Sequence, residues 1–190
     1  MKIIYDDYGG AHSTQVAAAI HLGKLPGDRV ASAAELMALP LFDRTTNKYH
    51  GCLVFMGKDE HDNEVYVLGR GSGNKNIERA IASGLTLTGD NQVSLRFFDT
   101  LTCVNLWMRI GGFFSRALDW VWLGRPLVIY GTQRAFPALH KVVAKAKQWS
   151  AQGAAAGIIA SDGADLHPMV CSCRDGIVPG ITAPPLTGQE

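Results

Sequence analysis

Residues 2–14 read Lys2-Ile3-Ile4-Tyr5-Asp6-Asp7-Tyr8-Gly9-Gly10-Ala11-His12-Ser13-Thr14, and this stretch decides the fold. Its first four residues form an apolar run typical of a short buried strand, and the polar and small residues after Tyr5 predict a turn. The segment 15–22 predicts a helix that ends at Gly23. A glycine-rich turn between a strand and a helix gathers unpaired backbone N–H groups, which suit an anion such as phosphate.

Beyond this opening unit, apolar runs typical of strands alternate with segments typical of helices. Strands are expected at 52–57, 64–69, 93–98, 126–130 and 158–160, the first two forming a hairpin. Helices are expected at 33–38, 76–83, 104–123 and 137–149, the first with a capping box made by Ser32 and Glu35. The alternation predicts a three-layer α/β domain with a mostly parallel sheet and an inserted antiparallel β-hairpin.

Composition limits the classes of protein that need to be considered. Residues 1–150 are expected to form the α/β domain, and the Gly/Ala/Pro-rich segment 151–190 a poorly ordered C-terminal extension. A formal net charge of +1 is no strong signal for nucleic acid. No segment approaches the roughly 20 apolar residues of a membrane helix. The four cysteines form no disulfide framework, which favours a reduced, cytoplasmic protein.

Ligands of open α/β sheets bind beyond the carboxyl ends of the strands, and the expected strand ends carry polar or glycine residues. Arg70, Lys75 and Arg134 are therefore expected to neutralise a bound phosphate. His12 is expected to contact or protonate the ligand, because a histidine at a helix N-terminus favours the neutral ring.

Two acidic residues at strand ends, Asp7 and Asp99, complete the candidate catalytic set. They could jointly hold a divalent cation, such as a Mg²⁺ ion that accompanies a nucleotide or phosphate ester. Solvated turn residues or helix caps are the simpler interpretation, so no dedicated metal site is expected.

The first turn is similar to a degenerate P-loop of the kind found in the partition and septum-site ATPases. It keeps the glycine pair and the final hydroxyl, but Ser13 stands where the catalytic lysine would be and His12 where the second glycine would be. Without a lysine, ordinary ATP hydrolysis is not expected, although backbone groups could still bind phosphate. The binding residues would be Gly9, Gly10, Ala11, Ser13 and Thr14. The alternative is a tight turn in which Ser13 or Thr14 only caps the helix.

Several segments together resemble the domain-of-unknown-function 3189 family. They are residues 1–5 and 8–13, Phe55-Met56-Gly57, and Glu64-Val65-Tyr66-Val67-Leu68-Gly69. The resemblance covers roughly residues 1–150. It implies a small bacterial cytoplasmic protein with no assigned activity, and it carries over no catalytic residues.

The resulting expectation is a protein that binds a phosphorylated or nucleotide-like small molecule at the turn 9–14. Phosphoryl transfer or hydrolysis is the first reaction to consider, and the sequence leaves open whether there is catalysis. The alternative is a non-enzymatic regulatory or assembly module, whose aromatic segment 104–123 would contact a protein partner or a second copy of the chain. Arg109 and Arg116 share one face of that segment, either as a solvated face or as a basic wall beside the site.

Overall fold

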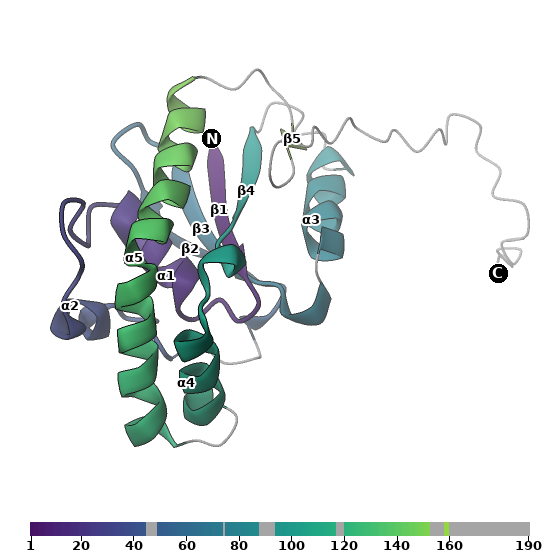
Figure 1. The fold of residues 1–190 in the computed structure, drawn as a ribbon. Coiled ribbons are helices and arrows are strands. Elements are labelled where there is room, and N and C mark those ends of the chain that lie inside the picture. Colours follow the sequence, from purple (N-terminus) through teal and green to yellow (C-terminus); the bar gives the residue numbers. More distant parts are fainter. Residues whose placement is uncertain (45–48, 74, 88–93, 117–119, 153–157, 160–190) are drawn as a thin grey trace, which may run out of the picture.

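The protein is a mixed α/β fold in which helices cover both faces of one mostly parallel sheet (Figure 1). The structure is a computed structural model that describes residues 1–44, 49–73, 75–87, 94–116, 120–152 and 158–159. Its strands are β1 (Lys2–Asp7), β2 (Leu53–Lys58), β3 (Glu64–Gly69), β4 (Leu95–Asp99) and β5 (Ile158–Ile159). Its helices are α1 (Ser13–His21), α2 (Ala33–Ala38), α3 (Lys75–Leu87), α4 (Leu106–Arg116) and α5 (Val121–Ala151), with short 3₁₀ turns at Gly71–Gly73 and Leu101–Cys103.

The sheet has the order β2-β3-β1-β4-β5, so the first strand of the chain lies at its centre. β1 pairs in parallel with β3 on one side and with β4 on the other, and Ile4 lies opposite Tyr66 and Phe97. β2 and β3 form an antiparallel hairpin. The predicted strand, helix and hairpin of residues 2–69 are confirmed, as is the capping box of Ser32 and Glu35.

Alternate residues of β1 enter two different cores. Ile3 and Tyr5 pack with α1, α2 and α5 on one face of the sheet. Ile4 packs with Leu95, Phe97 and the apolar side of α3 on the other face. This alternation follows from the two-residue period of a strand, and it places a helix layer on each side of the sheet.

The predicted strand 126–130 is wrong, and the predicted helix 104–123 is confirmed only in part, over α4. α4 ends at Arg116, and the 31-residue helix α5 begins at Val121 and continues through Pro126 and Pro137. Buried residues recur along α5 at helical spacing from Gly124 and Val128 to Leu139, Val143 and Ala146. A short apolar run after a proline fits a strand or a buried helix equally well, and here the longer 3.6-residue pattern prevails.

Glycines let α4 and the first half of α5 approach each other closely, and these two segments lie side by side below the sheet in Figure 1. A Cβ atom added at Gly124 would lie 2.4 Å from the backbone nitrogen of Ser115. A Cβ atom at Gly111 would lie 2.6 Å from the nitrogen of Val128. Gly111 and Gly124 therefore allow this close packing, because a side chain at either position would clash with the facing helix.

The predicted C-terminal extension lies almost wholly outside the described residues, so that prediction stays untested. Within the described part of the chain, no helix is both long and apolar enough to cross a membrane.

The close helix contact leads to a stability prediction. Gly124→Ala should lower the free energy of unfolding by about 1–3 kcal/mol, because the added methyl group forces the two backbones apart. Gly84→Ala is the matched control, since Gly84 lies in α3 with no atom within 4 Å of an added Cβ. That control should be neutral or stabilise by up to about 1 kcal/mol. Urea unfolding of both variants tests the packing, and an equal effect of the two substitutions would contradict it.

Candidate functional site

An open pocket of about 700 Å³ lies at the carboxyl ends of β1 and β4. β1 lies between β3 and β4, so the chain connections leave β1 toward both sides of the sheet. The strand order reverses at this point, and ligands of such sheets usually bind beside it. One wall is the turn after β1, with Asp7, Tyr8, Gly9, Ala11, His12 and Ser13. The opposite wall comes from the segment after β4 and from α4, with Leu101, Val104, Met108, Arg109, Gly112 and Phe113.

The turn is held in shape by Asp7 and by a glycine contact. Asp7 Oδ1 accepts a hydrogen bond from the Gly10 N–H, and its Oδ2 accepts one from Ser13 Oγ, each at 2.5 Å. Gly10 has a φ of +68°, and a Cβ atom there would lie 2.9 Å from the nitrogen of Gly69. Only glycine fits this position, so the loop passes tightly over the end of β3.

The N-terminus of α1 opens at this turn without a side-chain cap. His12 is the N-cap residue but makes no capping hydrogen bond, and the first turn of the helix has no acidic side chain. The first N–H groups of a helix have no partner within it and carry the positive end of its dipole. Thr14 Oγ1 is buried and has no hydrogen-bond partner within the described part of the chain. The turn thus has the geometry of an anion site.

His12 lines the pocket and is held by a residue distant in the sequence. Its Nε2 lies 3.1 Å from Oδ1 of Asp43, whose side chain is fully buried. Burial alone would raise the pKa of Asp43, but hydrogen bonds from His12, Ser115 and Arg125 lower it overall. Asp43 is therefore ionised at neutral pH. The sequence analysis did not single out Asp43, because no motif links positions 12 and 43.

Arg70 follows β3 as expected, but its guanidinium is buried among three carboxylates. Nη1 lies 2.8 Å from both Asp6 Oδ2 and Glu78 Oε1, and Nη2 lies 2.9 Å from Asp99 Oδ1. The structure therefore pairs Arg70 and Asp99 with each other, and neither lines the pocket beside Asp7. Burial raises the pKa of Asp6 to about 8, and Glu78 and Asp99 add to the rise against the opposing effect of Arg70.

Of the two other expected cations, the structure places Arg134 away from the pocket and does not describe the side chain of Lys75. Arg134 was expected at a strand end, but it lies in α5, where its Nε donates to Tyr130 Oη at 3.0 Å. Lys75 begins α3, and its side chain lies outside the described structure. Arg109 on α4 is the arginine that lines the pocket, as one of the two interpretations of its helical face predicted.

The described residues contain no group of three or more His, Cys, Asp or Glu side chains suited to a metal ion. Asp7 is the carboxylate among the pocket-lining residues.

The chain belongs to the DUF3189 family, described as proteins of unknown function, because the family model matches residues 2–148. This match confirms the resemblance seen in the opening turn and the hairpin. No curated protein and no solved structure matches the chain.

The buried cluster around Arg70 leads to a pH prediction. In the folded protein, a protonated Asp6 leaves Arg70 facing two charged carboxylates, those of Glu78 and Asp99. In the unfolded chain, Asp6 releases its proton near pH 4. Between about pH 4 and pH 8 the folded state binds more protons, so its stability should fall as the pH rises, by at most about 1.4 kcal/mol per pH unit. Asp6→Asn should flatten this fall in urea unfolding at about pH 5, 7 and 9.

Asp62→Asn provides the control, because the Asp62 side chain is 81% exposed. It should keep the slope of the native protein. Parallel pH profiles for the native protein and Asp6→Asn would exclude Asp6 as the source of the dependence.

Proposed function

We propose that the protein binds a phosphorylated or nucleotide-like small molecule in the pocket, with its phosphate on the turn 9–14 in a P-loop-like manner. The observation that carries this proposal is the uncapped N-terminus of α1, which opens into a large pocket at the switch point of the sheet. The backbone N–H groups of Ala11 and Ser13, two residues that line the pocket, are the candidate contacts. Asp7 keeps the turn in this shape before the ligand arrives.

Arg109 takes the part that a P-loop assigns to lysine. It reaches the pocket from α4, opposite the turn, and its guanidinium suits a phosphate oxygen pair. The other side chains on its wall are mostly apolar, and two of them are well exposed, Leu101 at 43% and Phe113 at 57%. A ligand with an anionic end and a flat apolar part, such as a nucleotide, matches both walls.

If the bound phosphate is transferred or hydrolysed, Asp7 and His12 are two of the titratable pocket residues placed to take part, beside His50. A Mg²⁺ ion that bridges a phosphate and a carboxylate would use Asp7. Asp99 forms an ion pair with Arg70 in the buried cluster, so its role in this proposal is structural.

The cellular setting that we propose is the bacterial cytoplasm. Cys52 and Cys103 are free thiols, which agrees with a reducing compartment. Burial raises the pKa of Cys103, so this thiol is protonated and unreactive despite its position before a helix.

A non-enzymatic regulatory or assembly module is the second candidate function. Its support is a set of exposed aromatic side chains on α4 and around the start of α5: Trp107, Phe113, Trp120 and Trp122, the last of them 78% exposed. Exposed aromatic groups of this size are typical of protein contact surfaces. This module would keep the fold and lack turnover of any phosphate ester.

Ligand binding can be tested by thermal shift and calorimetry with inorganic phosphate, pyrophosphate, AMP and ATP, each with and without Mg²⁺. A ligand at about 100 times its Kd should stabilise the protein by about 2.7 kcal/mol. Arg109→Gln should weaken binding of the phosphate compounds roughly tenfold or more, because a charged hydrogen bond contributes about 1.5–3 kcal/mol.

Arg134→Gln is the matched control, since Arg134 is an exposed arginine that bonds to Tyr130 outside the pocket. It should leave the affinities unchanged. If none of the four compounds binds, the phosphate proposal fails and the assembly module becomes the better account. Equal losses in the two variants would move the site away from the pocket.

A further inference from the structure

The described structure holds two His–Asp pairs with the same contact and length. His12 Nε2 lies 3.1 Å from Asp43 Oδ1, and His21 Nε2 lies 3.1 Å from Asp59 Oδ2. The two histidines occupy opposite ends of α1, His12 as its N-cap and His21 as its last residue. The difference between their surroundings indicates which pair can do chemistry.

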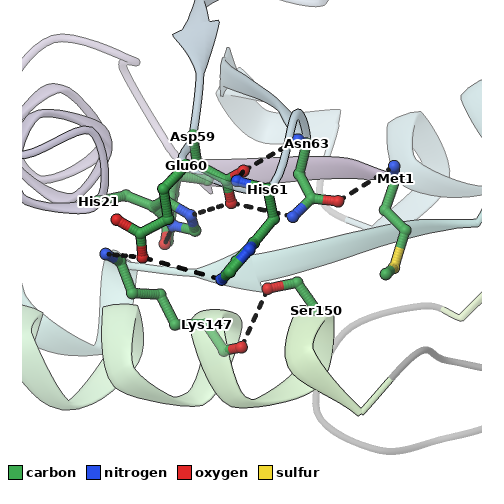
Figure 2. A network of polar contacts seen from close by, with 9 residues as sticks. Met1, His21, Asp59, Glu60, His61, Asn63, Lys147 and Ser150 are labelled. Carbon is green, nitrogen blue, oxygen red and sulfur yellow. Dashed lines mark hydrogen bonds and ion pairs between the residues drawn. The ribbon is translucent and has the colours of Figure 1, made fainter.

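The pair at His21 is closed. Its Nδ1 lies 2.7 Å from Tyr5 Oη, so both ring nitrogens have partners, and its side chain is fully buried. Figure 2 shows Asp59 in the turn between β2 and β3, where it also accepts hydrogen bonds from Asn63. Burial lowers the pKa of His21, so the ring is neutral and the contact is a hydrogen bond that fastens α1 to the hairpin.

The pair at His12 is open on one side. Nε2 of His12 is hydrogen-bonded to Asp43, and the Phe42 ring packs edge-on against the His12 ring with 5.6 Å between the ring centroids. The adjoining ring edge, formed by Cε1 and Nδ1, faces Gly112, where an added Cβ would lie 3.5 Å from Cε1 and 3.9 Å from Nδ1. Both His12 and Gly112 line the pocket. The nitrogen left for a ligand is therefore Nδ1.

Asp43 is itself held from several directions. Ser115 Oγ lies 2.9 Å and 3.0 Å from its two carboxylate oxygens, and Arg125 Nε lies 3.3 Å from Oδ2. Its backbone N–H donates to Ala11 O in the turn, and its φ is +55°, a conformation that aspartate tolerates better than most residues. A carboxylate with this many donors stays ionised and fixed, and it accepts the Nε2–H of His12.

We propose that His12 is a general base that acts through Nδ1 on the ligand in the pocket, and that Asp43 is the positioning residue that keeps the proton on Nε2. This inference rests on the proposed function for its substrate, a phosphate ester. In hydrolysis, Nδ1 takes a proton from a water molecule while the water oxygen bonds to phosphorus. The bond from phosphorus to the ester oxygen breaks, and that oxygen leaves with the electron pair. Asp43 stabilises the imidazolium that forms.

The first test measures the tautomer of His12 by ¹⁵N NMR at about pH 8.5, where an ordinary histidine is neutral. His12→Gln identifies the signals by their loss. The native protein should show Nε2 protonated and Nδ1 unprotonated, whether or not any ligand binds. Asp43→Asn should shift the population toward protonated Nδ1, because an amide can donate to Nε2. Asp59→Asn, the same substitution at the closed pair, should leave the His12 signals unchanged.

The second test uses p-nitrophenyl phosphate, an aryl phosphate that needs no proton on its leaving group. His12→Gln should abolish turnover, and Asp43→Asn should lower kcat about 10- to 100-fold with little change in KM. Asp59→Asn should keep the native kcat.

The outcomes separate this inference from the proposed function. A native His12 with its proton on Nδ1, or an Asp43→Asn variant with the native tautomer, overturns the role of Asp43. The native spectrum decides the first point even if the variant does not fold. Binding of the ester without turnover overturns the general base and leaves the binding function intact. Absence of binding is a failure of the proposed function, and the tautomer measurement still decides the role of Asp43.

Discussion

The buried carboxylate of Asp43 joins the parts of the molecule that form the pocket. It receives donors from the turn before α1, from α4 and from α5, and its own side chain is fully buried. A buried charge is stable only when its hydrogen bonds are satisfied, so these elements can keep their positions only together. The glycine contact between α4 and α5 supports this arrangement. Gly124 lies against the backbone of Ser115, and the hydroxyl of Ser115 donates a hydrogen bond to Asp43.

The charges near the turn are divided between structure and site. Arg70 looks like a phosphate ligand in the sequence, but its burial with Asp6, Glu78 and Asp99 makes it a structural cation under the carboxyl ends of the strands. The Arg70 side chain is 5% exposed and lies among carboxylates outside the pocket, so it is poorly placed to meet a ligand there. Arg109 comes from α4, lines the pocket and is exposed.

The two His–Asp pairs show how one local contact can serve two purposes. Their hydrogen-bond lengths are equal, so the contact itself does not separate them. The two pairs differ at the second ring nitrogen, Nδ1. In His21 this nitrogen is hydrogen-bonded to Tyr5 inside the core, and in His12 it lies on the ring edge that faces Gly112 and the pocket. Only a nitrogen that a ligand can reach is able to move a proton for it.

Much of the fold was predictable because it depends on local patterns. The apolar runs, the glycine-rich turn and the capping box of Ser32 and Glu35 act over a few residues, and they predicted the central strand, α1, α2 and the hairpin. Residues 126–130 were not predictable in this way, since a five-residue apolar run fits a strand as well as the long helix it joins. The partners of Arg70 and His12 lie many positions away along the chain, at Asp6, Asp99 and Asp43. The sequence by itself determined where the strand-turn-helix unit lies. Only the tertiary structure decided which of its polar groups are used inside the protein and which face the pocket, because burial and long-range contacts arise when the whole chain packs.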